Sequence, residues 1–296
     1  MKQIYRYRII VIILVSVLLS ETLWIINNLK ENHSGQEETW DFSYDYEITS
    51  HFEEALTDGR IEVWFQPIVD PNTNETVGAE ALSRWKDKDG YISPSVFVPA
   101  LEESGQVLEL DKNAFLQACR FQKERKDAGE NVFPISVNLS VVSLAQDNIV
   151  SDCLEILNSN GVPAESISIE VTESIDSDKG NLGKVVNDLH TAGFLVEIDD
   201  FGAGYASLVN LALIPYDVLK IDKSIIDEIG TERGDLLLCD TINMAKDFNF
   251  KVIVEGVETE DQIEYLKNKG CDAVQGYYYS KPLSYADFIN YLSSNS

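Results

Sequence analysis

The stretch Ile198-Asp199-Asp200-Phe201-Gly202 ends a short apolar run with two adjacent carboxylates, and it sets the pattern for the chain. Other short apolar runs also end in carboxylate, amide or lysine side chains. These are Glu80-Ala-Leu, Val137-Asn-Leu-Ser, Ile169-Glu-Val-Thr-Glu-Ser, Leu219-Lys-Ile-Asp, Val254-Glu-Gly-Val-Glu and Val274-Gln-Gly-Tyr. Strands that each end in a functional side chain predict a parallel barrel whose active face is the ring of strand C-termini.

The acids gathered at these strand ends predict a metal site. Many carboxylates in one barrel mouth cannot stay ionised together without cations among them. Hard divalent cations such as Mg²⁺ or Mn²⁺ prefer carboxylate and amide oxygens, and two of them about 3.5–4 Å apart can clamp a phosphodiester. The oxygens are offered by Glu80, Asn138, Glu170, Asp199, Asp200 and Glu255. We therefore expect a two-metal site and an anionic ligand.

Length and charge limit the alternatives. A (β/α)₈ barrel takes about 250 residues, which leaves an appendage in a chain of 296 residues. The net charge of −27 disfavours binding of polymeric nucleic acid or anionic lipid through the main domain. The histidines at 33, 51 and 190 lie outside the strand-end segments, which argues against zinc.

The N-terminal segment predicts a membrane anchor. Basic residues precede a mostly apolar stretch over residues 9–26, which is just long enough to span a bilayer. A signal peptide is the alternative, but the small residues of a cleavage site are poorly placed around Ser20. We expect one hydrophobic helix as the anchor within residues 1–28, a polar acidic linker over 29–47 and the barrel domain over 48–296.

The orientation of this anchor is in conflict with the expected function. Basic residues before the segment and acids after it place the large domain outside the cell. The expected function requires that the barrel lie in the cytoplasm. We therefore expect a membrane-anchored protein with a cytoplasmic barrel, although the charge pattern predicts the opposite orientation. After the linker, Ser50-x-x-Glu53 resembles a capping box, which predicts that a helix begins near Ile48.

The fold class expected is α/β, a TIM-like (β/α)₈ barrel. Strands are expected at 61–67, 76–82, 133–139, 167–172, 194–199, 218–221, 252–255 and 273–277, and helices at 111–127, 143–159, 179–192, 232–248 and 260–269. Only residues 70–75 separate the first two strands, which suits a hairpin and not a helical crossover. We therefore expect one strand at the start of the barrel to be antiparallel.

Over residues 48 to 293 the chain resembles the EAL family of cyclic di-GMP phosphodiesterases. The strings that carry the resemblance occur in the expected order. They are Phe65-Gln-Pro-Ile-Val, Glu80-Ala-Leu-Ser-Arg-Trp, Val137-Asn-Leu-Ser, Glu170-Val-Thr-Glu-Ser, Asp199-Asp-Phe-Gly-Ala-Gly-Tyr, Leu219-Lys-Ile-Asp, Glu255-Gly-Val-Glu-Thr and Gln275-Gly-Tyr. The resemblance implies hydrolysis of cyclic di-GMP to linear pGpG, with the six oxygen donors named above as the ligands of Mg²⁺ or Mn²⁺.

The resemblance also implies roles for single residues. Lys220, Glu255 and Glu80 would be catalytic, with Lys220 holding or activating the attacking water. Substrate contacts would come from Gln66, Leu82, Arg84 and Gln275, and supporting contacts from Glu173, Asp222 and Glu258, with Glu173 anchoring the loop after Asp200. That loop links metal binding to dimerisation in the family, which implies a homodimer through the barrel domain.

Each role has a structural alternative. Lys220 ends an apolar run, so its amine must be paired or have a lowered pKa, and an ion pair with Asp222 or another barrel acid would satisfy it. Gln66 can equally be a buried amide whose hydrogen bonds are all made within the protein. Departures from the family pattern are Ser83, the pair Trp64-Phe65 and Ala206, and none removes a metal ligand.

Two other functions stay open beside the phosphodiesterase. One is a receptor that binds cyclic di-GMP without cleaving it, which a turnover assay would distinguish. The other is a membrane-tethered interaction protein that uses the barrel as a docking surface, for which Glu80→Ala would leave the cellular phenotype intact.

Overall fold

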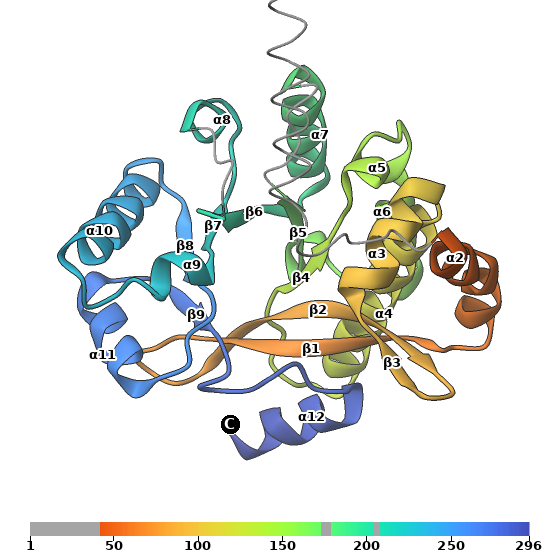
Figure 1. The fold of residues 1–296 in the computed structure, drawn as a ribbon, viewed down its shortest axis with the longest axis horizontal. Coiled ribbons are helices and arrows are strands. Elements are labelled where there is room, and N and C mark those ends of the chain that lie inside the picture. Colours follow the sequence, from red (N-terminus) through yellow and green to blue (C-terminus); the bar gives the residue numbers. More distant parts are fainter. Residues whose placement is uncertain (1–41, 173–178, 204–207, 296) are drawn as a thin grey trace, which may run out of the picture. The chain divides into compact units, whose positions relative to one another are not determined.

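The computed structural model describes residues 42–172, 179–203 and 208–295 (Figure 1). The strands are β1 (Ile61–Val69), β2 (Thr76–Asp87), β3 (Gly90–Ile92), β4 (Ile135–Asn138), β5 (Ile167–Thr172), β6 (Leu195–Phe201), β7 (Val218–Ile221), β8 (Lys251–Val254) and β9 (Ala273–Gln275). The helices are α2 (Phe42–Thr57), α3 (Pro94–Ser104), α4 (Val107–Asp127), α5 (Val141–Leu144), α6 (Ile149–Asn160), α7 (Lys179–Ala192), α8 (Leu208–Leu213), α9 (Lys223–Ile226), α10 (Glu232–Asp247), α11 (Glu260–Lys269) and α12 (Tyr285–Ser294), with a 3₁₀ turn at Ala164–Ser166.

The strands form a closed barrel, as the sequence predicted. Around the ring the order is β1, β9, β8, β7, β6, β5, β4 and β2, and pairing of β1 with β2 closes it. The strands from β2 round to β9 pair in parallel. β1 is antiparallel to both of its neighbours, β2 and β9. The expected antiparallel strand at the start of the barrel is therefore confirmed.

Strand alternation separates the barrel wall into two faces. Side chains at successive positions of a strand point to opposite faces. Ile169 and Val171 belong to the large core between barrel and helices, whereas Glu170 between them points into the barrel. A separate apolar cluster fills the barrel interior at the end opposite the strand C-termini; it consists of Ile68, Val218, Ile253 and Ala273. The acid cluster thus lies at the end of the interior where the parallel strands end.

The pair of strands β1 and β2 extends beyond the barrel. β2 pairs with β4 only over Ala79–Ala81, and its later residues continue with β1 and β3. In Figure 1 this extension lies beside α2 and α3. Trp85 packs there against Phe52 of α2 and Phe97 of α3, so one face of the extension is covered.

Helix boundaries differ from those predicted; α4, for example, begins at Val107 and not at residue 111. α2 begins at Phe42, and Ser50 lies inside it with its hydroxyl donating to the Glu47 carbonyl, so the expected capping box is wrong. The single helix expected over 143–159 is two helices, α5 and α6.

The predicted anchor over residues 1–28 lies outside the described residues, as does most of the predicted linker. Within the described part of the chain, no helix is both long and apolar enough to cross a bilayer.

Candidate active site

Lys220 is the centre of the acid cluster at the strand C-termini. Its side chain is 1% exposed at the end of β7, and its Nζ atom contacts carboxylates from four other strands or strand ends. The contacts are Glu255 at 2.6 Å, Glu170 at 2.7 Å, Asp199 at 3.0 Å and Glu80 at 3.7 Å. An ion pair with Asp222 or with another barrel acid was the structural alternative for Lys220. In the structure Lys220 pairs with the barrel acids.

Burial and like charge shift the proton affinities of this cluster. Burial raises the pKa of Glu170 well above its usual value, and the neighbouring Glu80 raises it further. Burial likewise raises the pKa of Glu255 to about 8, although Lys220 opposes the shift. Burial alone would lower the pKa of Lys220, but Asp199, Glu170 and Glu255 raise it above its usual value. The amine is therefore protonated, as a buried lysine among acids should be.

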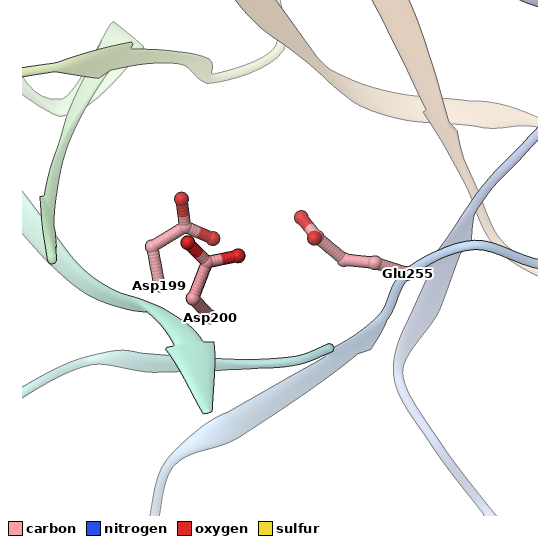
Figure 2. Close-up of side chains that lie close together, drawn as sticks. All are labelled: Asp199, Asp200 and Glu255. Carbon is pink, nitrogen blue, oxygen red and sulfur yellow. The ribbon is translucent and has the colours of Figure 1, made fainter. Parts of the chain in front are cut away.

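Asp199, Asp200 and Glu255 direct their carboxylates toward a common space (Figure 2). Each offers one oxygen, and these oxygens lie within 4.8 Å of one another. Two consecutive strand residues would normally point apart. Here the pairing of β6 with β7 is irregular between Ile198 and Phe201, and Asp200 has a φ of 56°. This left-handed conformation, uncommon outside glycine, turns Asp200 to the same side as Asp199.

A second group of predicted ligands lies on the other side of Lys220. The Asn138 amide nitrogen donates to Glu170 at 2.7 Å and to Glu80 at 3.1 Å. The amide oxygen, which a metal would need, is therefore turned away from both carboxylates. Ligation by Asn138 requires rotation of its amide group.

Two glutamines on the adjacent strands β1 and β9 support Glu80. Gln275 donates to Glu80 at 2.6 Å and to the Gln66 side-chain oxygen at 3.1 Å. Gln66 in turn donates to the Ser280 carbonyl. Gln66 and Gln275 are 8% and 4% exposed, so both amides support the carboxylate of Glu80 from within the wall.

The donor set fits divalent cations. An ammonium group carries three N–H donors, too few for the four carboxylates around Lys220. The ammonium contacts Glu170 Oε1 and Asp199 Oδ1, which are buried and have no other hydrogen-bond donor among the described residues. Acids that outnumber their one lysine provide the oxygen-rich environment that Mg²⁺ or Mn²⁺ prefers.

A cavity of about 270 Å³ opens beside the cluster, between β2, α3 and α4. Leu82, Arg84 and Asn138 line one side, and Val98 and Leu110 provide apolar walls. Two residues with predicted substrate contacts, Leu82 and Arg84, therefore border a space next to the predicted metal ligands.

The remaining predicted site residues are spread around the mouth. Asp222 caps α9 by accepting from the Ser224 amide at 2.9 Å. Glu258 pairs with Lys223 at 3.0 Å. Glu173 lies outside the described residues, as do residues 204–207 of the glycine-rich loop.

Sequence reasoning missed Glu197. It lies on β6 two positions before Asp199, is 3% exposed and accepts from the Ser136 hydroxyl at 3.1 Å. Burial raises its pKa. The period of two along β6 was the signal for it, because positions 197 and 199 share the inward face.

The chain belongs to the EAL domain family, whose family model matches residues 50–282. The probable cyclic di-GMP phosphodiesterase PdeG of Escherichia coli is 31% identical over 81% of this chain and 48% of its own length. The cyclic di-GMP phosphodiesterase NbdA of Pseudomonas aeruginosa is 32% identical over 83% of this chain and 32% of its own. The chain thus spans about a third to a half of these relatives.

Solved structures of similar domains share the fold. The phosphodiesterase MucR in complex with c-di-GMP superposes with a TM-score of 0.76 at 29% identity, covering 82% of this chain and 99% of that one. The EAL domain of Mycobacterium smegmatis DcpA gives a TM-score of 0.68 at 30% identity, with 80% and 97% covered.

Proposed function

We propose that this chain is a metal-dependent phosphodiesterase that hydrolyses cyclic di-GMP to linear pGpG and so lowers the level of this second messenger. The observation that carries the proposal is the contact of Lys220 with four carboxylates, beside the Asp199, Asp200 and Glu255 oxygens. Membership of the EAL family and the c-di-GMP complex of MucR support the choice of substrate.

The chemistry assigned to the chain's own residues is proton transfer and positioning. Two Mg²⁺ or Mn²⁺ ions, held by Glu80, Asn138, Glu170, Asp199, Asp200 and Glu255, would polarise the phosphodiester and lower the pKa of the attacking water. Lys220 orients that water through one of its N–H groups. Glu255, whose carboxylate contacts the Lys220 ammonium at 2.6 Å, takes up its proton. The water oxygen bonds to phosphorus, the bond to the 3′ oxygen breaks, and that oxygen receives the proton that the water gave to Glu255.

The rest of the dinucleotide would lie along β2. The apolar walls of the cavity beside Leu82 suit a purine base. Arg84 offers paired N–H donors that match two phosphate oxygens. The amides of Gln66 and Gln275 already form hydrogen bonds within the barrel wall. These two residues therefore act on the substrate chiefly through Glu80.

Turnover in the presence of Mg²⁺ or Mn²⁺ tests the proposal. Purified protein incubated with cyclic di-GMP should yield pGpG, resolved by chromatography, and Glu80→Ala should not. Tight binding without pGpG, under conditions in which a known cyclic di-GMP phosphodiesterase is active, would favour the receptor function and contradict ours.

We also propose that residues 9–26 anchor the protein in a membrane with the barrel in the cytoplasm, and that the barrel domain forms a homodimer. The apolar run supports the anchor, and the need for a cytoplasmic second messenger supports the orientation. Protease treatment of intact cells tests the orientation, since a digested barrel would place it outside. Light scattering on the purified barrel domain tests the dimer.

A further inference from the structure

The extension of β1 and β2 continues the face of the barrel that carries the acid cluster. In its register Gln66 lies opposite Glu80, and Trp64 lies opposite Leu82. Residues two apart on a strand share a face. Trp64 and Arg84 therefore belong to the same face as the site residues Gln66 and Glu80, farther out along the two strands.

Arg84 keeps its charge unpaired on this face. Its guanidinium carbon lies 5.7 Å from the centre of the Trp64 ring, and Nη1 donates to the Ser83 carbonyl at 2.9 Å. It forms no ion pair with any carboxylate among the described residues, in a chain with 50 acidic side chains. Its remaining N–H donors are thus available to an anion, with the aromatic ring as their support.

The Trp64 ring is itself fixed. Its Nε1 atom donates to Glu62 Oε2 at 3.3 Å, and the Tyr91 hydroxyl donates to the same oxygen at 3.0 Å. The Tyr91 ring meets the indole edge-on, with centroids 5.2 Å apart and planes at 72°. The Trp64 indole is thus held by Tyr91 on β3 and Glu62 on β1. Together they support the long side chain of Arg84.

We propose that Trp64 is a positioning residue for substrate binding, which holds the Arg84 guanidinium where it meets a phosphate of the bound dinucleotide. The inference rests on the proposed function. Arginine stacks on aromatic faces and binds phosphate with a planar fork of donors. When the guanidinium is already held in place, less conformational entropy is lost on ligand binding. Trp64 therefore contributes to affinity through Arg84 and not through contact with the reacting atoms.

A double-mutant cycle on the full chain tests this, with kcat and KM for cyclic di-GMP and the Kd from calorimetry measured for each variant. A cation–π contact at a partly exposed site predicts a rise in KM and Kd of about two- to fivefold for Trp64→Ala. The kcat should stay within about twofold of wild type, because ground state and transition state lose the same contact. Trp64→Phe should recover most of the affinity. In an Arg84→Ala background, Trp64→Ala should change nothing further.

Phe248→Ala is the matched control, because Phe248 is a 41%-exposed aromatic residue outside the site; it should behave as wild type. An equal effect of Trp64→Ala with and without Arg84 would overturn the inference and leave the proposed function intact. So would a loss confined to kcat, or a Trp64→Phe variant as weak as Trp64→Ala. A wild-type chain that neither binds nor cleaves cyclic di-GMP would overturn both.

Discussion

Lys220 Nζ lies 2.7 Å from Glu170 Oε1, and neither side chain has more than 1% of its surface exposed. This buried pair explains how so many acids share one barrel mouth in the metal-free protein. The lysine supplies the first positive charge within the cluster, and divalent cations would supply the rest. The pair also gives Lys220 a structural role, so its removal should affect stability as well as turnover.

Lys220→Met should lower kcat by about 100-fold or more, the scale of loss for one positioned donor. It should also lower the free energy of unfolding of the metal-free protein by about 3–5 kcal/mol, because buried carboxylates lose their partner. That loss should be larger at pH 8 than at pH 6, where the carboxylates can take up protons. Kinetics and urea unfolding in EDTA measure both effects.

Lys123→Met is the control for this variant, since the ion pair of Lys123 with Asp127 on α4 is solvent-exposed. It should change stability by less than about 1 kcal/mol. Full activity of Lys220→Met would remove Lys220 from the mechanism, and unchanged stability would show that the four contacts contribute nothing net.

Divalent metal should stabilise the folded protein and be needed for turnover. At 100 times its Kd, Mg²⁺ or Mn²⁺ should add about 2.7 kcal/mol, measured as a rise in Tm. Metal affinity should increase from pH 6 to pH 8, because the proton on Glu255, with a pKa near 8, competes with metal. Asp199→Asn with Asp200→Asn should abolish the rise in Tm. A rise that survives this change would place the metal elsewhere.

Asp111 should make stability depend on pH without touching the metal site. Burial raises its pKa to about 6, although the Ser143 hydroxyl and Ser140 amide donate to it. Between the unfolded pKa near 4 and the folded pKa, the unfolded state has lost the proton that the folded state keeps. Stability therefore falls as pH rises through this window, by up to about 3 kcal/mol.

Unfolding of wild type and Asp111→Asn between pH 4 and pH 7 measures this contribution. The difference in free energy of unfolding, wild type minus variant, should decrease with rising pH and level off above about pH 6. A difference that does not vary with pH would show that the Asp111 carboxyl has an ordinary pKa.

Gly276, which follows β9, should not tolerate a side chain. A Cβ atom there would lie 2.0 Å from the Val257 carbonyl oxygen, so backbone must move. Gly276→Ala should destabilise the protein by several kcal/mol and displace the strand end that carries Gln275. Gly183→Ala on α7 is the matched control, since nothing lies within 4 Å of its Cβ position, and it should stabilise by up to about 1 kcal/mol. Equal melting temperatures for the two variants would contradict the account.

The sequence predicted the barrel and the set of acids because both follow from local patterns. Each strand is a short apolar run, and most of the site residues lie on the inward face of their strands near the same end of the barrel, so strand alternation brings them together. The adjacent pair Asp199 and Asp200 was predicted to turn to one site, and the irregular pairing after Ile198 provides the turn.

What the sequence could not provide are contacts made across the fold. Nothing local shows that Asp111 on α4 accepts from Ser140 and Ser143, and this contact accompanies the separation of α5 from the expected single helix. In the same way, the partners of Lys220 come from strands far apart in the chain. Glu197, in contrast, could have been predicted from the sequence, because it lies two positions before Asp199 on the same strand.

The central claim is that water attacks one phosphodiester of cyclic di-GMP at the Lys220 site. The most direct measurement is a reaction in ¹⁸O-labelled water with Mg²⁺ or Mn²⁺, analysed by mass spectrometry. We expect pGpG that carries one labelled oxygen in its terminal 5′-phosphate with the wild type, and formation of this product about 100-fold or more slowly with Lys220→Met. Unchanged cyclic di-GMP with the wild type, or pGpG without the label, would contradict the account.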